Sequence, residues 1–399
     1  MLLVPIWAWS AGADGQPDCD SENEKLRLGQ GLAYPCLSYL ESEESTSANA
    51  SVGDVNGDGH LDIVLIRGRH WPVRNRLLFG DGTGAFPRSV DIGASADRSY
   101  TGALADLDLD GDLDLVVSND RPDRNPVYLN DGRGTLAQAS SFGDSSWKTR
   151  NISLADVSGD GFPDVIVANR GREEGGSPNH LCINDGAGAF PSCLELSRES
   201  ATTITPADIN ADGLLDLVVP HRDGGQSAVY LQTPGDVLAF ESVPFGPAAA
   251  SVRATAVADF DGDGRLDIAA IYTGNSEGGD GERDGPSTWQ GAYLYYGLAE
   301  GRFSEPELLG DASRVPYALA VAELNGDGAA DLIVGYVEAS TGVFLNAGNR
   351  GFTRLDLGDS DGATYGFAVG DLDEDGYSDI VVAKSGARNR VFFGAGEAR

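Results

Sequence analysis

The chain has 399 residues, of which 41% are hydrophobic and 23% are charged, and this composition excludes a disordered or collagen-like protein. Its formal net charge is −34 at pH 7, so the surface should repel nucleic acid and anionic membranes, and we expect neither as a partner. Beyond the first residues, no segment approaches the roughly 20 apolar residues that a membrane-spanning helix needs.

The chain begins with a short apolar run, residues 1–13, which ends in small residues typical of a cleavage site. We interpret residues 1–13 as a truncated signal peptide, or as the sign of a start placed too far downstream. Residues 14–30 would form an N-terminal extension. The sequence therefore predicts a secreted, extracytoplasmic protein.

The four cysteines are predicted to form two disulfides in that oxidising environment. Cys182 and Cys193 flank a glycine-rich segment that is typical of a hairpin turn, so they should face each other on adjacent strands. Cys19 and Cys36 then remain for each other. The alternative is four buried free thiols.

One aspartate-rich phrase recurs seven times, beginning at Asp54, Asp106, Asp156, Asp208, Asp259, Glu323 and Asp371. Each copy is preceded by one apolar segment and followed by another, and a second, glycine-rich turn comes about fifteen residues later in the first three copies. This pattern predicts four strands per repeat. Seven such units predict an all-β fold, a seven-bladed β-propeller of four-stranded antiparallel blades that spans residues 31–399 as one domain.

Two features predict how the ring is held together. Positions one and three residues before each phrase carry small side chains, such as Gly53 and Ser51, while the position between them is mostly larger. The larger face of one blade should therefore pack on the small face of the next. The seventh repeat ends after its third strand, so we expect residues 31–40 to supply the missing outer strand and close the ring.

The phrase itself is a candidate cation-binding loop. Oxygen-bearing side chains at positions 1, 3, 5 and 9, with a backbone carbonyl at position 7 and glycine at position 6, suit a hard cation such as calcium. An EF-hand is excluded because position 12 is apolar and lies in a strand. These positions hold 24 acidic residues, and without them the net charge would be −10. The alternative is aspartate-rich turns without metal.

We predict up to seven calcium ions, one per blade, with the sites at Ser158 and Glu323 the weakest. The predicted ligands in chain order are Asp54, Asn56, Asp58, His60, Asp62, Asp106, Asp108, Asp110, Asp112, Asp114, Asp156, Ser158, Asp160, Phe162, Asp164, Asp208, Asn210, Asp212, Leu214, Asp216, Asp259, Asp261, Asp263, Arg265, Asp267, Glu323, Asn325, Asp327, Ala329, Asp331, Asp371, Asp373, Asp375, Tyr377 and Asp379.

These repeats resemble the FG-GAP/VCBS family, which includes the integrin α-chain propeller and secreted propeller lectins. The resemblance covers roughly residues 31–399, although the integrin-type Gly-Ala-Pro triplet is replaced by Gly-Ala-Phe at 84–86 and 188–190. It implies calcium in the loop between the first and second strands of each blade. It also implies a ligand on the opposite face of the disc.

On that opposite face the sequence places 18 of the 28 Lys and Arg residues, in loops. Six residues before each phrase, at the predicted rim of the central channel, lie Ala48, Tyr100, Arg150, Thr202, Arg253, Tyr317 and Tyr365, with Trp71 and Trp147 nearby. Arginine suits carboxylates and sulfates, and aromatic faces suit sugar rings, so an acidic glycan is the expected ligand. The alternative is that these arginines neutralise neighbouring acids.

No catalytic constellation stands out in the sequence. We therefore predict a binding or adhesion module, a monomer, for an extracellular glycan or protein ligand. A protein adhesion or scaffold module is the first alternative. A polysaccharide lyase, with a tyrosine or histidine as its base, is the second.

Overall fold

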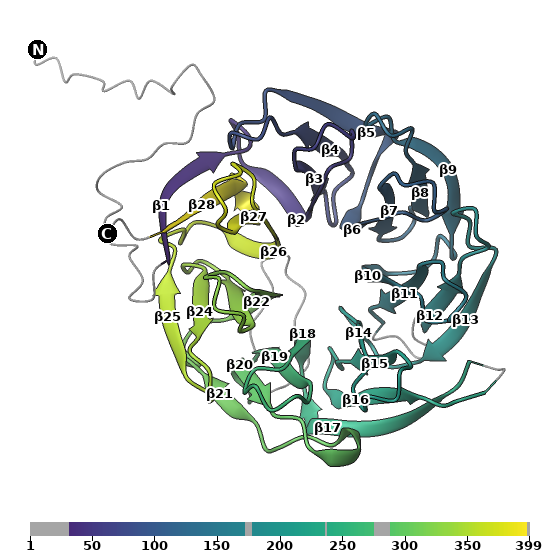
Figure 1. The fold of residues 1–399 in the computed structure, drawn as a ribbon. Coiled ribbons are helices and arrows are strands. Elements are labelled where there is room, and N and C mark those ends of the chain that lie inside the picture. The colour runs from purple at the N-terminus through teal and green to yellow at the C-terminus, as the bar shows by residue number, and fades with distance from the viewer. Residues whose placement is uncertain (1–31, 172–177, 236–237, 275–287, 397–399) are drawn as a thin grey trace, which may run out of the picture.

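The computed structural model describes residues 32–171, 178–235, 238–274 and 288–396, and these residues form a ring of seven four-stranded antiparallel blades around a central opening (Figure 1). Within them the strands are joined by turns and a single 3-10 turn, η2 (Ala299–Gly301), and there is no α-helix. No helix in these ranges has the length and hydropathy to cross a membrane. The predicted all-β, seven-bladed propeller is confirmed.

The strands follow the repeats, with the first strand of each blade at the centre and the fourth at the circumference (Figure 1). In blades 1 to 3 the strands are β2 (Ser45–Gly53), β3 (Asp62–Arg67), β4 (Val73–Phe79), β5 (Arg88–Asp97), β6 (Ser99–Ala105), β7 (Asp114–Asn119), β8 (Asn125–Leu129), β9 (Ala137–Phe142), β10 (Thr149–Ala155), β11 (Asp164–Asn169), β12 (Asn179–Ile183) and β13 (Ser192–Ser197). In blades 4 to 6 they are β14 (Thr205–Ala207), β15 (Asp216–Val219), β16 (Gly225–Gln232), β17 (Phe240–Ala250), β18 (Val252–Ala258), β19 (Asp267–Thr273), β20 (Gln290–Tyr295), β21 (Glu307–Leu309), β22 (Pro316–Ala322), β23 (Asp331–Tyr336), β24 (Gly342–Asn346) and β25 (Phe352–Asp356).

Blade 7 joins the two ends of the described chain. It contains β26 (Ala363–Gly370), β27 (Asp379–Ala387), β28 (Arg390–Gly396) and, as its outer strand, β1 (Leu32–Tyr39). Strand β1 pairs antiparallel with β28, from Leu32 opposite Gly396 to Tyr39 opposite Arg390. The side chains of Leu32 and Tyr34 are fully buried. Closure by an N-terminal strand is therefore confirmed.

Adjacent blades pack through the predicted contrast of small and larger side chains. A Cβ added to Gly53 of blade 1 would lie 3.3 Å from Leu104 of blade 2, and one added to Gly370 of blade 7 would lie 3.4 Å from Val52 of blade 1. The second strands, such as β7 and β11, are buried along their whole length between neighbouring blades. Tight burial of these apolar strands is the main stabilising contribution to the ring.

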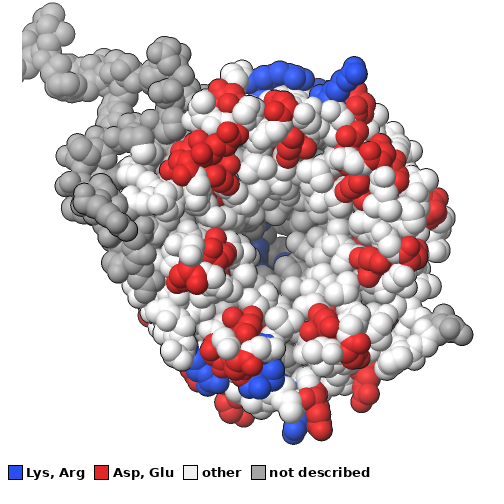
Figure 2. All heavy atoms as spheres, in the orientation of Figure 1, with Lys and Arg blue, Asp and Glu red and all other residues white. Residues whose placement is uncertain are grey.

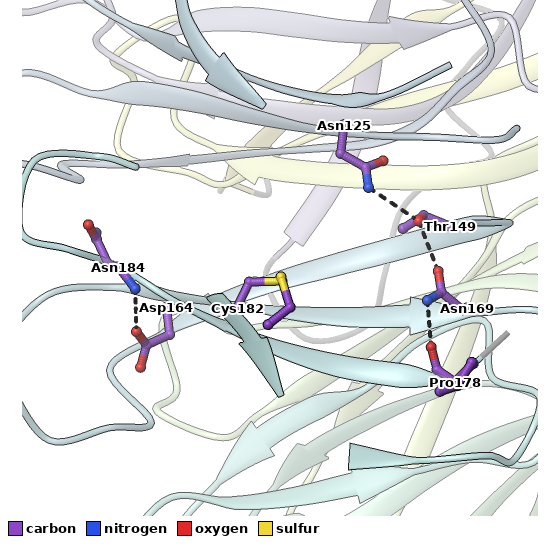
Figure 3. The surroundings of a disulfide bond; sticks show 8 residues. Asn125, Thr149, Asp164, Asn169, Pro178, Cys182 and Asn184 are labelled. Carbon is purple, nitrogen blue, oxygen red and sulfur yellow. Dashed lines mark hydrogen bonds between the residues drawn. A yellow bond between two sulfur atoms is a disulfide. The ribbon is translucent and has the colours of Figure 1, made fainter. Parts of the chain in front are cut away.

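Cys182 and Cys193 form the predicted disulfide between β12 and β13, where they lie directly opposite each other (Figure 3). Cys19 lies outside the described residues, so its pairing with Cys36 stays a prediction. The same is true of the signal peptide, residues 1–13, and of the extension, residues 14–30.

An asparagine at the start of several third strands supports the neighbouring turn. The Asn125 side-chain oxygen accepts the backbone N–H of Asn119 (2.7 Å), and that of Asn179 accepts the backbone N–H of Asn169 (2.8 Å). Figure 3 shows how Asn125, Thr149 and Asn169 continue this network from blade 2 into blade 3. Asn125 and Asn179 are thus structural residues.

Candidate functional site

Each aspartate phrase forms the loop between the first and second strands of its blade. The carboxylate at position 1 folds the loop by accepting backbone N–H groups: in blade 2, Asp106 accepts those of Asp110 (3.1 Å) and Gly111 (3.0 Å). In blade 6 the longer side chain of Glu323 accepts the N–H of Gly326 at 2.6 Å. Glutamate at this position therefore preserves the turn.

The carboxylate at position 9 begins the second strand and is almost completely buried in all seven blades. One oxygen of Asp114 accepts the N–H of Leu107 in the loop (3.0 Å), and the other accepts the N–H of Asn130 after the third strand (2.8 Å). The same two-sided arrangement is made by Asp62, Asp164, Asp216, Asp267, Asp331 and Asp379. Position 9 is thus a structural anchor as well as a candidate ligand, a role that the sequence analysis missed.

Burial raises the pKa of these position 9 carboxyl groups in the metal-free protein. It raises the pKa to about 6 at Asp62, Asp114, Asp267 and Asp331, and to about 7 at Asp379. The cause is the loss of water around a negative charge, which the backbone N–H groups offset only in part. A bound cation would favour the charged form of each group.

Three loops bring three carboxylates close enough to share one ion: Asp106, Asp108 and Asp114 in blade 2, Asp259, Asp261 and Asp263 in blade 5, and Asp371, Asp373 and Asp379 in blade 7. These are the loops with aspartate at position 3. One carboxylate oxygen of Asp108 and one of Asp373 are buried without a hydrogen-bond partner. An unpartnered buried carboxylate oxygen is costly unless a cation is present, so the donor set fits calcium.

The loops with asparagine at position 3 are organised differently. In blades 1, 4 and 6 the asparagine amide donates to the position 5 carboxylate, from Asn56 to Asp58 (2.9 Å), Asn210 to Asp212 (3.0 Å) and Asn325 to Asp327 (3.0 Å). This hydrogen bond partly replaces the attraction that a cation would provide. Blade 3 carries Ser158, whose backbone N–H donates to Asp164.

Basic side chains also reach two of the loops. In blade 5, Arg265 at position 7 pairs with Asp263, and Arg350 from blade 6 pairs with Asp261 at 2.9 Å. In blade 1, the His60 ring bonds Glu374 of blade 7 at 2.5 Å, and this hydrogen bond raises the pKa of His60. The blade 5 carboxylates are thus partly neutralised by arginine. Figure 2 shows one face of the ring, on which carboxylates gather in separate clusters around the central opening.

The opposite ends of the innermost strands surround a cavity of about 150 Å³ in the central opening. All seven predicted rim positions line it: Ala48, Tyr100, Arg150, Thr202, Arg253, Tyr317 and Tyr365. Each is six residues before a loop, so it lies roughly 20 Å along the strand from the candidate cation site. The structure therefore brings these seven residues together in space.

The two arginines of this cavity have different surroundings. Arg150 is buried, pairs with Asp120 at 3.0 Å and lies over the Tyr100 ring. Burial alone would raise the pKa of Asp120, but the hydrogen bond to His70 and the Arg150 charge lower it to about 2. The Tyr100 hydroxyl in turn bonds the His70 ring at 2.9 Å. Arg150 is therefore already neutralised.

Arg253 is half-buried, and no described carboxylate lies within ion-pair distance of it. Its guanidinium lies 3.8 Å from the centre of the Tyr317 ring and 5.3 Å from that of Tyr365, and its Nε donates to the Tyr317 carbonyl at 2.7 Å. Stacking and this hydrogen bond fix its direction. The hydroxyl of Tyr317 and that of Thr203 are buried without a hydrogen-bond partner beside it.

The two predicted tryptophans do not line the cavity. Trp71 is 51% exposed and contacts the His70 ring edge-on, whereas Trp147 stacks on the His180 ring at 4.0 Å between centroids. Many of the basic residues that were predicted on the face away from the acidic loops form ion pairs. This agrees with the alternative that these residues neutralise neighbouring acids. The pairs include Arg98–Asp123, Arg170–Asp223, Arg314–Asp356, Lys384–Asp359 and Arg390–Asp361. Two of the 18 basic residues that the sequence places on this face, Arg172 and Arg283, lie outside the described residues.

The fold and the seven loops define a class of protein, a repeat propeller with acidic loops. The model of the FG-GAP-like repeat matches residues 54–117, 106–167, 156–219, 208–270 and 323–382, which include all seven loops. The chain belongs to the FG-GAP-like repeat family. No curated protein matches its sequence.

Solved structures share the fold. A lectin from Agrocybe aegerita, described as recognising non-reducing terminal N-acetylglucosamine, has 22% identity and a TM-score of 0.54, with 79% of this chain and 82% of the lectin covered. BBS1N in complex with ARL6DN, soaked with mercury, has 12% identity and a TM-score of 0.56, with 90% and 95% covered. The lead-soaked crystal of that complex has 13% identity, the same TM-score and the same coverage.

Proposed function

We propose that this propeller is a secreted, calcium-stabilised binding module that takes an acidic glycan at the central cavity, on the side away from the acidic loops. The observation that carries the proposal is Arg253, a cation stacked on Tyr317 and Tyr365 with no carboxylate partner among the described residues. A planar guanidinium suits the carboxylate or sulfate of such a glycan, and the tyrosine rings suit its sugar faces. The unpaired hydroxyls of Tyr317 and Thr203 supply further hydrogen bonds.

Two further observations support calcium and secretion. The unpartnered oxygens of Asp108 and Asp373 favour a bound cation in blades 2 and 7. A disulfide such as Cys182–Cys193 persists in oxidising, extracytoplasmic surroundings. A lectin is among the solved structures of similar fold, which supports the proposal of a carbohydrate ligand.

Replacing Arg253 by alanine should weaken retention on an immobilised acidic polysaccharide by roughly 10- to 150-fold, because a charge-assisted pair contributes roughly 1.5–3 kcal/mol. The matched control is Arg314→Ala, which removes an equal charge that already pairs with Asp356. Affinity chromatography at two salt concentrations would measure both variants. Equal retention of Arg253→Ala and the unsubstituted protein would contradict the cavity as the glycan site.

A protein ligand is the second candidate, and BBS1N bound to ARL6DN supports it because a propeller of similar fold is there part of a protein complex. Capture of a protein partner without competition by soluble glycan would favour it. The lyase alternative has its own readout, the ultraviolet absorbance of an unsaturated sugar released from the acidic polysaccharide.

A further inference from the structure

A second cavity, of about 360 Å³, lies between blades 4 and 5, away from the central opening. It is bounded by β17 of blade 4 and by the segments around β20 and β21 of blade 5, which are neighbours at the circumference (Figure 1). Its volume falls within the range of small-molecule sites, roughly 300–1,000 Å³. Neither the acidic loops nor the central cavity includes its lining residues.

Four aromatic side chains line the cavity. Phe245 contacts Tyr295 at 5.6 Å and Phe303 at 6.2 Å between ring centroids, and Trp289 lines the cavity beside them. The hydroxyls of Tyr295 and Tyr272 bond each other beneath it, so the floor is held in one position. The cavity therefore offers a ligand several aromatic rings that are inclined to one another.

Part of this arrangement is a feature of the repeat. Gly246 has φ of 66°, and a Cβ there would lie 2.9 Å from the Tyr295 hydroxyl, just as a Cβ at Gly93 in blade 1 would lie 2.6 Å from that of Tyr128 in blade 2. Phe303 is likewise a repeat residue, at the position of Phe86 and Phe190 after the same turn, and Phe142 contacts Phe190 as Phe245 contacts Phe303. Trp289 is an aromatic side chain that blade 5 adds to this arrangement.

Two hydrogen-bond acceptors accompany the aromatic walls. The Gln226 side-chain N–H donates to the carbonyl of Phe245 (2.7 Å) and to that of Gly246 (3.3 Å), which leaves its amide oxygen without a donor among the described residues. The Glu305 carboxylate has no ion-pair or hydrogen-bond partner in the same ranges. No Lys or Arg is among the lining residues.

We propose that this cavity between blades 4 and 5 binds an uncharged pyranose sugar, and that it is independent of the acidic-glycan site. A pyranose presents an apolar ring face to Trp289 or Phe303, while its hydroxyls donate to Gln226 and Glu305. An anionic sugar would be repelled by Glu305. A quaternary ammonium ion has no donor, so burying it would leave the Gln226 oxygen unpaired.

Titration calorimetry with four probes tests the proposal: the methyl glycosides of a neutral hexose and of an N-acetylhexosamine, methyl glucuronide, and choline. A neutral glycoside should bind at millimolar or better affinity, and Phe303→Ala and Trp289→Ala should each weaken it at least about tenfold. Glu305→Ala, at an exposed position, should weaken it several-fold without affecting folding. Trp71→Ala is the matched control, since it removes an exposed tryptophan elsewhere, and it should change nothing.

Thermal melts establish that each variant is folded, and Glu305→Ala keeps the test valid if loss of Trp289 prevents folding. Binding of choline or glucuronide in preference to both neutral glycosides would overturn the proposal. So would the absence of neutral binding, or neutral binding that survives all three substitutions. Arg253→Ala should leave this binding intact, which separates its outcome from that of the central cavity.

Discussion

Removal of residues 1–40 should prevent the chain from forming a stable ring. The deletion removes β1, whose Leu32 and Tyr34 side chains are fully buried against blades 6 and 7. Burial of two such side chains contributes about 3–6 kcal/mol, before the strand hydrogen bonds with β28 are counted. Because a typical domain is stable by only about 5–15 kcal/mol, we expect unfolded or aggregated protein.

Circular dichroism and size-exclusion chromatography would compare this deletion with removal of residues 1–18, which keeps both β1 and Cys19. The shorter deletion should give a folded monomer. If the longer deletion gave a soluble protein that melts cooperatively, the outer strand of blade 7 would be dispensable. That result would contradict closure of the ring by β1. Exposure of β28 as an open edge also predicts self-association of the longer deletion.

Chelation of divalent cations should lower the melting temperature by more than about 10 °C. Three loops each gather three carboxylates within 4.8 Å of one another, and these carboxylates repel without a cation. A cation present at 100 times its dissociation constant raises the free energy of unfolding by about 2.7 kcal/mol per site. Each 1 kcal/mol shifts the melting temperature by about 2–4 °C in a protein of 150–250 residues. Differential scanning fluorimetry in chelator and in calcium would measure the effect.

The variant Asp373→Asn tests the same prediction at a single loop, that of blade 7. The substitution converts the blade 7 loop to the type seen in blades 1, 4 and 6, where asparagine at position 3 donates to position 5. We expect Asp373→Asn to raise the melting temperature in chelator, because it removes one of three repelling carboxylates. We also expect it to reduce the increase in melting temperature that calcium produces. Identical melting temperatures in chelator and in calcium, for the unsubstituted protein, would contradict the cation sites.

The ring could be predicted because its causes are local and repeated. Seven copies of one phrase predict seven blades, and the missing fourth strand of the last repeat predicts the closing role of β1. The seven rim positions also follow, since equal spacing from each loop places Tyr100, Arg253 and their equivalents at one end of the innermost strands. Cys182 and Cys193 follow from the hairpin between them.

The charge pairing could not be predicted, because it joins residues that are distant in sequence. Arg170 reaches Asp223 in the next repeat, and Arg150 reaches back to Asp120, so a count of basic residues overstates the positive charge of that face. The second role of the position 9 carboxylates was hidden for another reason: their partners are backbone N–H groups of the same blade, which any residue type supplies. The cavity between blades 4 and 5 depends on Phe245 and Phe303, which approach only when neighbouring blades pack.

The most direct measurement is retention of the purified protein on immobilised acidic and neutral polysaccharides, with calcium and with chelator. Our account predicts calcium-dependent retention on the acidic material that weakens with salt, as expected of a charged contact at Arg253. Retention on the neutral material, which we expect from the cavity between blades 4 and 5, should resist salt. Absence of retention on the acidic polysaccharide with calcium present would contradict the proposed function.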